Sequence, residues 1–346
     1  MHKITICGHF GGNEKFLDGQ TIKTKNIYLA LLEKYGEKEI NRIDTYHWKK
    51  QPIIFLKRCL KGIKESKNII ILPAQNGVRV FIPLFLLINK LYKRRIFYIV
   101  IGGWLPEFLE NRKGLLEKVK KLDKVFVETN KMKRQLANLE IKNVEILVNF
   151  KNITPLKEEE LNFNHSKPYK LCTFSRVIQE KGIEDAIQVV KNINEEFNEM
   201  VYKLDIYGPI DEKYKERFTK IINNIPEYIQ YKGCIDSEKS VNILKNYYLL
   251  LFPTKFKTEG IPGTIIDALS AGVPIVASRW DNVDEIIIDG INGLIYEFNN
   301  LADFYAKLKT MLNCQKVFII KKNCVECAKN FDSNVAIEPL TNALIG

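Results

Sequence analysis

Residues 251–278 read LFPTKFKTEGIPGTIIDALSAGVPIVAS, and this stretch decides the expected fold. The apolar and aromatic run at 247–252 predicts a strand that is buried on both faces. A loop follows, in which Pro262 delays the start of a helix. The helix is expected from Thr264, and a glycine and a proline end it before a second buried strand at 273–277. This strand–loop–helix–strand unit implies a parallel sheet with a right-handed crossover.

Two carboxylates flank the start of the predicted helix: Glu259 lies just before it and Asp267 just inside it. The N–H groups of the loop and of the first helical turn lie at the positive end of the helix dipole, which favours a phosphate group there. One acid can reach the ligand near the phosphate, and the other can reach a more distant hydroxyl. The arrangement suits a ligand that is part phosphate and part polyol, as a nucleotide sugar is.

The same stretch resembles the E-x7-E signature of family 4 retaining glycosyltransferases, which have the GT-B fold. It has the form E-G-x-P-G-x-x-x-D-A-x-x-A-G-x-P-x-V-A-S between Glu259 and Ser278. Residues 174–182 read FSRVIQEKG, which is similar to the family's G-R-L-x-x-x-K-G element. One departure is Asp267, where the family usually has Glu. The resemblance implies an α/β fold of GT-B type, with two doubly wound Rossmann-like domains that face each other across a cleft.

The resemblance implies catalytic roles for Glu259, Arg176 and Lys181. In relatives the acid lies against the transferred sugar, while an arginine and a lysine suit a diphosphate leaving group. Asp267 would accept hydrogen bonds from the ribose hydroxyls, and two N–H groups at the helix start would bind the diphosphate. The residues expected around the donor are Gly12, Arg176, Lys181, Gly208, Lys232, Cys234, Glu259, Ile261, Gly263, Thr264 and Asp267.

These residues also have ordinary structural explanations. Arg176 and Lys181 would fit a solvated basic loop, which is the usual place of such side chains. Glu259 would fit a helix N-terminal charge, a role that contributes only tenths of a kcal/mol.

Two domains and a tail are expected. Residues 1–155 would form an acceptor-binding Rossmann-like domain, and residues 166–330 a nucleotide-sugar-binding one. The stretch 152–166 has no apolar period and carries an acidic run, so it predicts an interdomain linker. Residues 331–346 would be a tail that packs back towards the first domain, as in the family.

A glycine-rich loop follows the first predicted strand, 3–7, and precedes a helix expected over 22–35. By resemblance, Gly12 and Gly19 in this loop allow close approach to the donor phosphates and the acceptor. They would equally fit a plain turn. Trp104 follows a later strand directly, where ligands of open α/β sheets bind. It would fit either an acceptor stacked on its ring or a core position.

Charge is distributed unevenly along the 346 residues. Residues 1–160 hold 31 Lys and Arg against 17 Asp and Glu, and residues 161–346 hold 22 against 24. The first half therefore carries +14, which predicts a polyanionic partner for that half alone. No nucleic-acid-binding motif is found, so nucleic acid is not expected as the partner. An anionic membrane surface is expected instead.

No metal or other cofactor is expected. The four histidines lack ligand spacing, and no D-x-D pair follows a buried strand. Seven scattered cysteines indicate free thiols in a reducing compartment. No signal peptide is predicted, and the longest apolar stretch, 78–88, is about half of a membrane span. The expected location is the cytoplasm, at the inner face of the cell membrane.

Amphipathic helices are predicted in the basic half. Residues 53–67 place an apolar stripe (Ile53, Leu56, Leu60, Ile63) beside a basic one (Lys57, Lys61, Lys64), and residues 113–124 repeat the arrangement with Leu115, Val119 and Leu122. A third basic cluster lies at 93–95. These stripes would fit a membrane-facing surface, or apolar stripes that face the domain core.

The sequence predicts a metal-independent, retaining hexosyltransferase. It would move a sugar from a nucleotide diphosphate sugar to a lipid-linked glycan, in capsule, O-antigen or exopolysaccharide synthesis. Two alternatives stay open at this point. One is another GT-B enzyme, such as a nucleotide-sugar epimerase or a phosphorylase. The other is a non-catalytic protein that binds polyanions.

Overall fold

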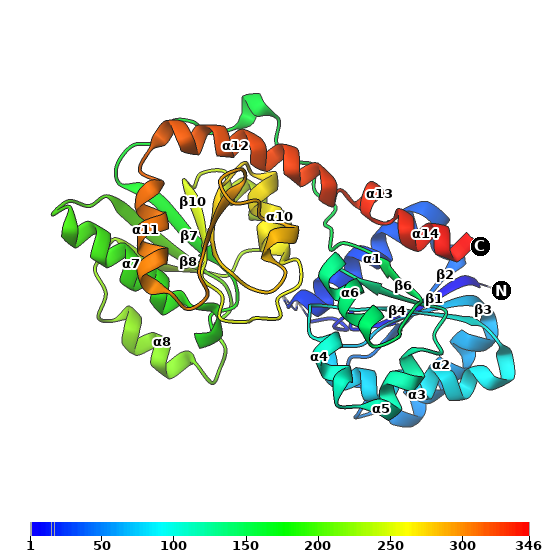
Figure 1. Cartoon of the computed structure of the whole chain (residues 1–346). Coiled ribbons are helices and arrows are strands. Elements are labelled where there is room, and N and C mark those ends of the chain that lie inside the picture. The colour runs from blue at the N-terminus through cyan, green and yellow to red at the C-terminus, as the bar shows by residue number, and fades with distance from the viewer. Residues whose placement is uncertain (1, 15, 17, 346) are drawn as a thin grey trace. The chain divides into compact units, whose positions relative to one another are not determined.

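The computed structural model describes residues 2–14, 16 and 18–345. The chain divides into two compact α/β units, shown in Figure 1. Unit 1 comprises residues 1–152 and 331–346, and unit 2 comprises residues 153–330. The α/β fold class with two parallel sheets is confirmed. In the described part of the chain, no helix has the length and apolar character needed to span a membrane.

The sheet of unit 1 has six parallel strands in the order β2-β1-β3-β4-β5-β6. Its central strands β1, β3 and β4 are apolar runs, as expected for strands covered on both faces. The strand β2 was not predicted, because its sequence INRID is largely polar. The strands are β1 His2–Gly8, β2 Ile40–Asp44, β3 Ser66–Leu72, β4 Arg95–Ile99, β5 Lys124–Val127 and β6 Val144–Ile146.

Helices cover both faces of this sheet. One core contains side chains of α2 to α6, and the other contains side chains of α1, α13 and α14. The terminal helix α14 is tied to the sheet, since Asn68 Nδ2 donates to the Leu344 carbonyl at 3.3 Å. The helices are α1 Gly19–Tyr35, α2 Pro52–Glu65, α3 Gln75–Tyr92, α4 Leu105–Glu110, α5 Lys113–Val119, α6 Asn130–Asn138, α13 Ser333–Ala336 and α14 Glu338–Ile345.

The sheet of unit 2 also has six parallel strands, in the order β12-β11-β10-β7-β8-β9. The pairing of β10 with β7 joins segments that lie nearly eighty residues apart in sequence. The edge strand β12 was not predicted. The strands are β7 Tyr169–Phe174, β8 Tyr202–Tyr207, β9 Ile229–Gly233, β10 Leu249–Phe252, β11 Ile275–Ser278 and β12 Gly293–Tyr296.

The helices of unit 2 form two layers. The helix α7 packs against α11, and α10 packs against α12 (Figure 1). The helix α9 also packs against α10. The helices are α7 Ile183–Glu196, α8 Lys215–Ile222, α9 Ser240–Leu244, α10 Gly263–Ser270, α11 Leu301–Thr310 and α12 Cys314–Ala328.

One local expectation is wrong. The helix α1 begins at Gly19, because the Asp18 side chain caps it by accepting from the Thr21 N–H. Gly19 therefore lies in the first helical turn and not in the glycine-rich loop. The stretch expected as the interdomain linker begins where the two units divide, and part of it packs within unit 2: Leu156 N–H donates to the Ser270 carbonyl, and the Leu161 side chain is buried.

One lysine of α12 is buried without a hydrogen-bond partner in the described residues. Lys321 is 0% exposed, and its Nζ atom meets no acceptor. Burial disfavours the ammonium form and lowers the pKa of Lys321 from 10.5 to about 8, and the nearby Cys324 opposes this only in part. His165 lies close by, and its pKa falls to about 4 for the same reason, with a further contribution from Lys321.

We expect Lys321→Met to stabilise the protein at pH 7. Lys321 is protonated there in both states, so the native state carries the full cost of the buried charge, up to about 3 kcal/mol. The advantage of the variant should shrink as pH rises from 8 towards 10.5, because the folded lysine then loses its proton before the unfolded one. The measurement is the free energy of unfolding in denaturant at pH 7 and pH 10. The control is Lys322→Met, which alters an exposed neighbour on α12. A less stable Lys321→Met at pH 7 would contradict the assignment.

Candidate active site

The predicted site residues of unit 2 lie at the carboxyl ends of neighbouring strands. Arg176 follows β7, Gly208 follows β8 and Cys234 follows β9, while Glu259 lies in the loop between β10 and α10. Lys181 ends a short 3-10 helix, Gln179–Lys181, in the connection from β7 to α7. Because the strands are parallel, all of these loops lie at one edge of the sheet, where ligands of open α/β sheets bind.

Two glycines let these loops pack closely. A Cβ atom on Gly208 would lie 1.8 Å from the carbonyl oxygen of Ser175, and one on Gly182 would lie 1.9 Å from that of Pro253. Both glycines have positive φ. Gly208 also uses its own backbone groups, since its N–H donates to Gly233 and its carbonyl accepts from the Tyr231 hydroxyl. Its position therefore has a packing reason in addition to the expected donor-binding role.

Lys181 and Glu259 form an ion pair, in which Lys181 Nζ contacts Glu259 Oε1. Both side chains are largely buried, with 15% and 16% of their surfaces exposed. The Thr254 hydroxyl donates to the same carboxylate oxygen at 3.0 Å. The Lys181 ammonium also lies 5.2 Å and 5.3 Å from the ring centres of Phe252 and Phe256, within the range of cation–π attraction. Each charge is thus compensated in a partly dry environment.

The loop that carries Glu259 is held by residues that sequence reasoning missed. Asn282 Nδ2 donates to the Glu259 carbonyl at 2.7 Å, and the Ser278 hydroxyl donates to the Thr254 carbonyl at 2.5 Å. These partners come from β11 and the segment after it. Ser278 is the last residue of the stretch quoted in the sequence analysis. Its contact with the Glu259 loop could not be predicted, however, because the contact depends on the order of the strands in the sheet.

The amino end of α10 lies beside β7. Its N-cap residue is Pro262, which provides no side-chain cap, so no side chain in the described part of the chain caps the first turn. The Thr264 hydroxyl donates to the Phe174 carbonyl at 2.8 Å, and this bond joins the helix start to the end of β7. The uncapped N–H groups at Gly263 and Thr264 suit an anion.

The other predicted donor residues of unit 2 differ in exposure. The side chains of Arg176, Lys232 and Cys234 are exposed. Asp267 and Ile261 are each 3% exposed. An aspartate so deeply buried would reach a ribose hydroxyl only after a local shift or through water. Its role in donor binding stays a prediction.

Gly12 lies in unit 1, in the loop after β1. Its N–H donates to Asp44 Oδ2 at 2.8 Å, so this group is already used within unit 1. Trp104 is half-buried: its Nε1–H donates to the Ile101 carbonyl at 2.7 Å, and its ring packs edge-on against Phe108. The ring thus contributes to the core, although part of its surface stays exposed.

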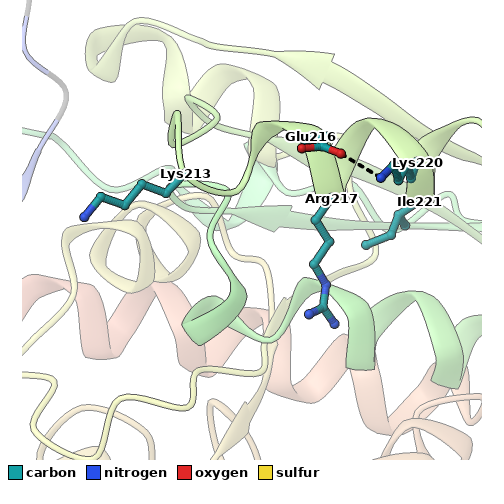
Figure 2. A pocket seen from close by; sticks show the side chains of 5 residues that line it. All are labelled: Lys213, Glu216, Arg217, Lys220 and Ile221. Carbon is teal, nitrogen blue, oxygen red and sulfur yellow. Dashed lines mark hydrogen bonds and ion pairs between the residues drawn. The ribbon is translucent and has the colours of Figure 1, made fainter.

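A shallow hollow of about 450 Å³ lies on unit 2 (Figure 2). It is lined by Lys213, Glu216, Arg217, Lys220 and Ile221, none of which is a predicted site residue. The Glu216 carboxylate pairs with Lys220. Within residues 2–14, 16 and 18–345, no group of three or more His, Cys, Asp or Glu side chains is placed to hold a metal ion.

The family described as glycosyl transferases group 1 matches residues 156–331, which is 176 of the 346 residues and nearly all of unit 2. The chain belongs to this family. The match includes both motif-like elements quoted above and the whole edge that carries Lys181, Glu259 and the start of α10. The expectation of a glycosyltransferase relationship is therefore confirmed.

Similar proteins agree with this result. An uncharacterized glycosyltransferase of Methanocaldococcus jannaschii is 28% identical over 197 residues, covering 56% of this chain and 46% of that protein. The N,N'-diacetylbacillosaminyl-diphospho-undecaprenol α-1,3-N-acetylgalactosaminyltransferase of Campylobacter jejuni is 23% identical over 214 residues, covering 58% and 54%. The chain spans about half the length of these curated relatives.

Among solved structures, HepE of Anabaena in complex with UDP and glucose has a TM-score of 0.75 and 12% sequence identity, and all of each chain is covered. At this identity the likeness bears on the fold alone. It shows that the expected GT-B fold is correct for the whole chain.

We expect Gly208→Ala to destabilise unit 2 by about 3–5 kcal/mol, because the new methyl group would overlap a backbone carbonyl that cannot move freely. The matched control is Gly233→Ala. Gly233 also has positive φ, but no atom lies within 4 Å of the added carbon, so its cost should stay near 1–2 kcal/mol. Chemical denaturation of both variants measures the difference. Equal losses would show that the close approach to Ser175 is unimportant.

Proposed function

We propose that this protein is a retaining glycosyltransferase of family 4 that transfers a hexose from a nucleotide diphosphate sugar without a metal ion. The observation that carries the proposal is the Lys181–Glu259 pair beside the uncapped start of α10, inside the segment that matches the family. A positive side chain, a carboxylate and free helix N–H groups are what a departing diphosphate and a sugar require. The complex of HepE with UDP and glucose shows a similar fold with such ligands.

The positive side chains and Glu259 would have different roles in the reaction. Lys181 and the exposed Arg176 would bind the diphosphate, which leaves with the electron pair of the broken glycosidic bond. Because Glu259 pairs with Lys181, the diphosphate would have to compete for the lysine. Glu259 is then released to bind the sugar hydroxyls and to stabilise the positive charge that develops on the ring. Binding of the donor would therefore release Glu259 from Lys181 in the same step.

The proposed acceptor is a lipid-linked glycan, used in the assembly of a surface polysaccharide. The Campylobacter jejuni relative is named for an acceptor joined to undecaprenol through a diphosphate. Such an acceptor lies in a membrane, so the enzyme would work at the cytoplasmic face of the membrane. The surface of unit 1 provides a physical reason for this placement.

The helix α2 exposes apolar and basic side chains together. Ile53 is 70% exposed and Leu60 is 38% exposed, and Leu56 lies between them on the same side of the helix. Only the fourth member of the predicted stripe, Ile63, faces the core; the side of α2 that packs inward holds Phe55, Cys59, Gly62 and Ile63. The exposed basic residues of α2 are Lys57, Arg58, Lys61 and Lys64.

The neighbouring helix α3 adds to this surface. It packs against α2, contains no acidic residue and exposes Leu87 and Leu91 at 63% and 80%. Basic residues follow at 93–95. Apolar side chains interleaved with lysines fit a lipid surface with anionic headgroups better than a protein core. The prediction for residues 113–124 is different: α5 ends at Val119, and Leu115, Val119 and Leu122 are buried, so that apolar stripe faces the core.

We expect Lys181→Ala to lower kcat about 10²- to 10³-fold with donor at saturation, because one preorganised positive charge on the departing diphosphate would be lost. The control is Lys255→Ala, which removes an exposed lysine of the adjacent loop that pairs with Asp185. Turnover of nucleotide sugars, followed by NMR of the product anomer, tests the whole proposal. Near-normal turnover of Lys181→Ala, an inverted product, or no transfer at all would each count against it.

We expect the protein to sediment with vesicles that contain anionic lipid at low salt. It should be released near 1 M salt, where the electrostatic screening length shortens to about 3 Å. Each lysine near the surface contributes about 1 kcal/mol. Reversing the charges of Lys57, Lys61 and Lys64 should abolish binding. Reversing Lys213, Lys215 and Lys220 on unit 2 should not, and it serves as the control. Equal binding to neutral vesicles would overturn the charge-based docking.

A further inference from the structure

Three side chains form a hydrogen-bonded chain at the carboxyl end of β1. The Asp18 carboxylate accepts from the Thr21 hydroxyl at 2.8 Å, and the same hydroxyl lies 2.7 Å from His9 Nδ1. His9 follows β1 directly and is half-buried, while Thr21 is fully buried in the first turn of α1. Nothing in the proposed donor site uses this chain of residues.

Local structure fixes the geometry. Asp18 is the N-cap of α1, and its second carboxylate oxygen accepts from the Thr21 N–H at 3.0 Å, so Thr21 is held at two points. Gly8 lets α1 approach the end of β1, since a Cβ atom there would lie 2.7 Å from Thr24. The contact between Thr21 and His9 is thus a consequence of how α1 starts.

The hydrogen atoms can be assigned by counting donors. A carboxylate only accepts, so the single hydroxyl hydrogen of Thr21 is given to Asp18. The oxygen of Thr21 can then only accept from His9, which means that Nδ1 carries a hydrogen. In the neutral imidazole the other nitrogen, Nε2, is left as an acceptor. Among the described residues, Nε2 has no hydrogen-bond partner.

The surroundings of His9 are aromatic. The rings of Phe16 and Tyr46 lie edge-on to the imidazole, with centres 5.1 Å and 5.7 Å away. The Tyr46 hydroxyl is already used, because it donates to Glu14 at 2.5 Å. Asp44 anchors the loop by accepting from the N–H groups of Phe10 and Gly12. A fixed acceptor atom among aromatic rings at the carboxyl edge of a parallel sheet is typical of a small-ligand site.

We propose that His9 Nε2 accepts a hydrogen bond from a hydroxyl group of the acceptor glycan, and that Asp18 and Thr21 are positioning residues that keep His9 in the required tautomer. The inference rests on the proposed glycosyltransferase function and names a recognition residue for its acceptor. Phe16 and Tyr46 form the apolar walls beside the bound hydroxyl.

The tautomer can be tested without any activity assay. The chain has four histidines, so ¹⁵N-labelled imidazole signals can be assigned one by one. We expect a hydrogen on Nδ1 of His9 in the native protein and in Thr21→Ser, which keeps the hydroxyl. Thr21→Val should release this preference while the protein stays folded by circular dichroism. A hydrogen on Nε2 in the native protein would overturn the proposal.

Two substitutions of His9 separate recognition from structure. The amide of asparagine takes the place of Nδ1 and can still donate to Thr21, but it lacks the far acceptor. The amide of glutamine reaches the place of Nε2, but it loses the bond to Thr21. If Nε2 recognises the acceptor, His9→Asn should raise the acceptor KM about tenfold, while His9→Gln keeps most of the affinity. If His9 only ties the loop to Thr21, His9→Gln should raise the acceptor KM more than His9→Asn does, and the proposal fails.

The probe is a set of octyl glycosides of glucose, galactose and N-acetylglucosamine, with His47→Asn as the control for an exposed neighbouring histidine. Binding of free nucleoside diphosphate is measured in parallel. Unchanged diphosphate binding with a raised acceptor KM supports the inference. If the native protein does not bind the nucleoside diphosphate, that result counts against the proposed function and not against this inference. If no glycoside alters the Nε2 signal of His9 in native protein that binds the diphosphate, the inference fails by itself.

Discussion

The pairing of β7 with β10 is the constraint on which the candidate site depends. It places the loop of Lys181 next to the loop of Glu259, although the two residues lie far apart in sequence. Once both side chains are four-fifths buried or more, each charge needs a partner, and the ion pair with the Thr254 hydroxyl satisfies that need. The glycines at 182 and 208 then matter because they allow the loops of adjacent strands to approach closely enough.

Much of this arrangement could be predicted from the sequence. The apolar runs at 69–72 and 247–252 and the glycine and proline after α10 carry strong local signals, so both parallel sheets and the end of α10 were found within a few residues. The strands β2 and β12 were missed because one is polar and the other is short and lies at a sheet edge. The Lys181–Glu259 pair needs the order of the strands, which no local pattern contains.

The outcome for the amphipathic helices shows a second limit. Both 53–67 and 113–124 place apolar residues at helical spacing, yet the stripe of α2 is mostly exposed and that of α5 is buried. Periodicity shows that a helix has a face, but the neighbours decide what covers it. In α2 the core is contacted by Phe55 and Cys59, which leaves Ile53, Leu56 and Leu60 on the outside. Asp267 is the opposite case, since its position in the motif gave no hint of its burial.

Each unit holds one polar side chain in a fixed orientation, Glu259 in unit 2 and His9 in unit 1, but different groups hold them. A functional polar side chain has to be held in one orientation before its ligand binds, and its hydrogen-bond partners have to lie on rigid elements. In unit 2 the carboxylate of Glu259 is held by Lys181, and under the proposed function the diphosphate of the donor would draw this lysine away and so remove the restraint. In unit 1 the imidazole of His9 is held by the buried hydroxyl of Thr21, which the helix cap Asp18 orients in turn. Under the proposed function the first arrangement takes some binding energy from the donor to free Glu259, which lowers the affinity for the donor but leaves kcat at saturating donor unchanged. The second keeps an acceptor atom available at no such cost. Under the proposed function, a donor that has to compete with Glu259 for Lys181 is consistent with an enzyme that commits its charges only after the diphosphate has bound.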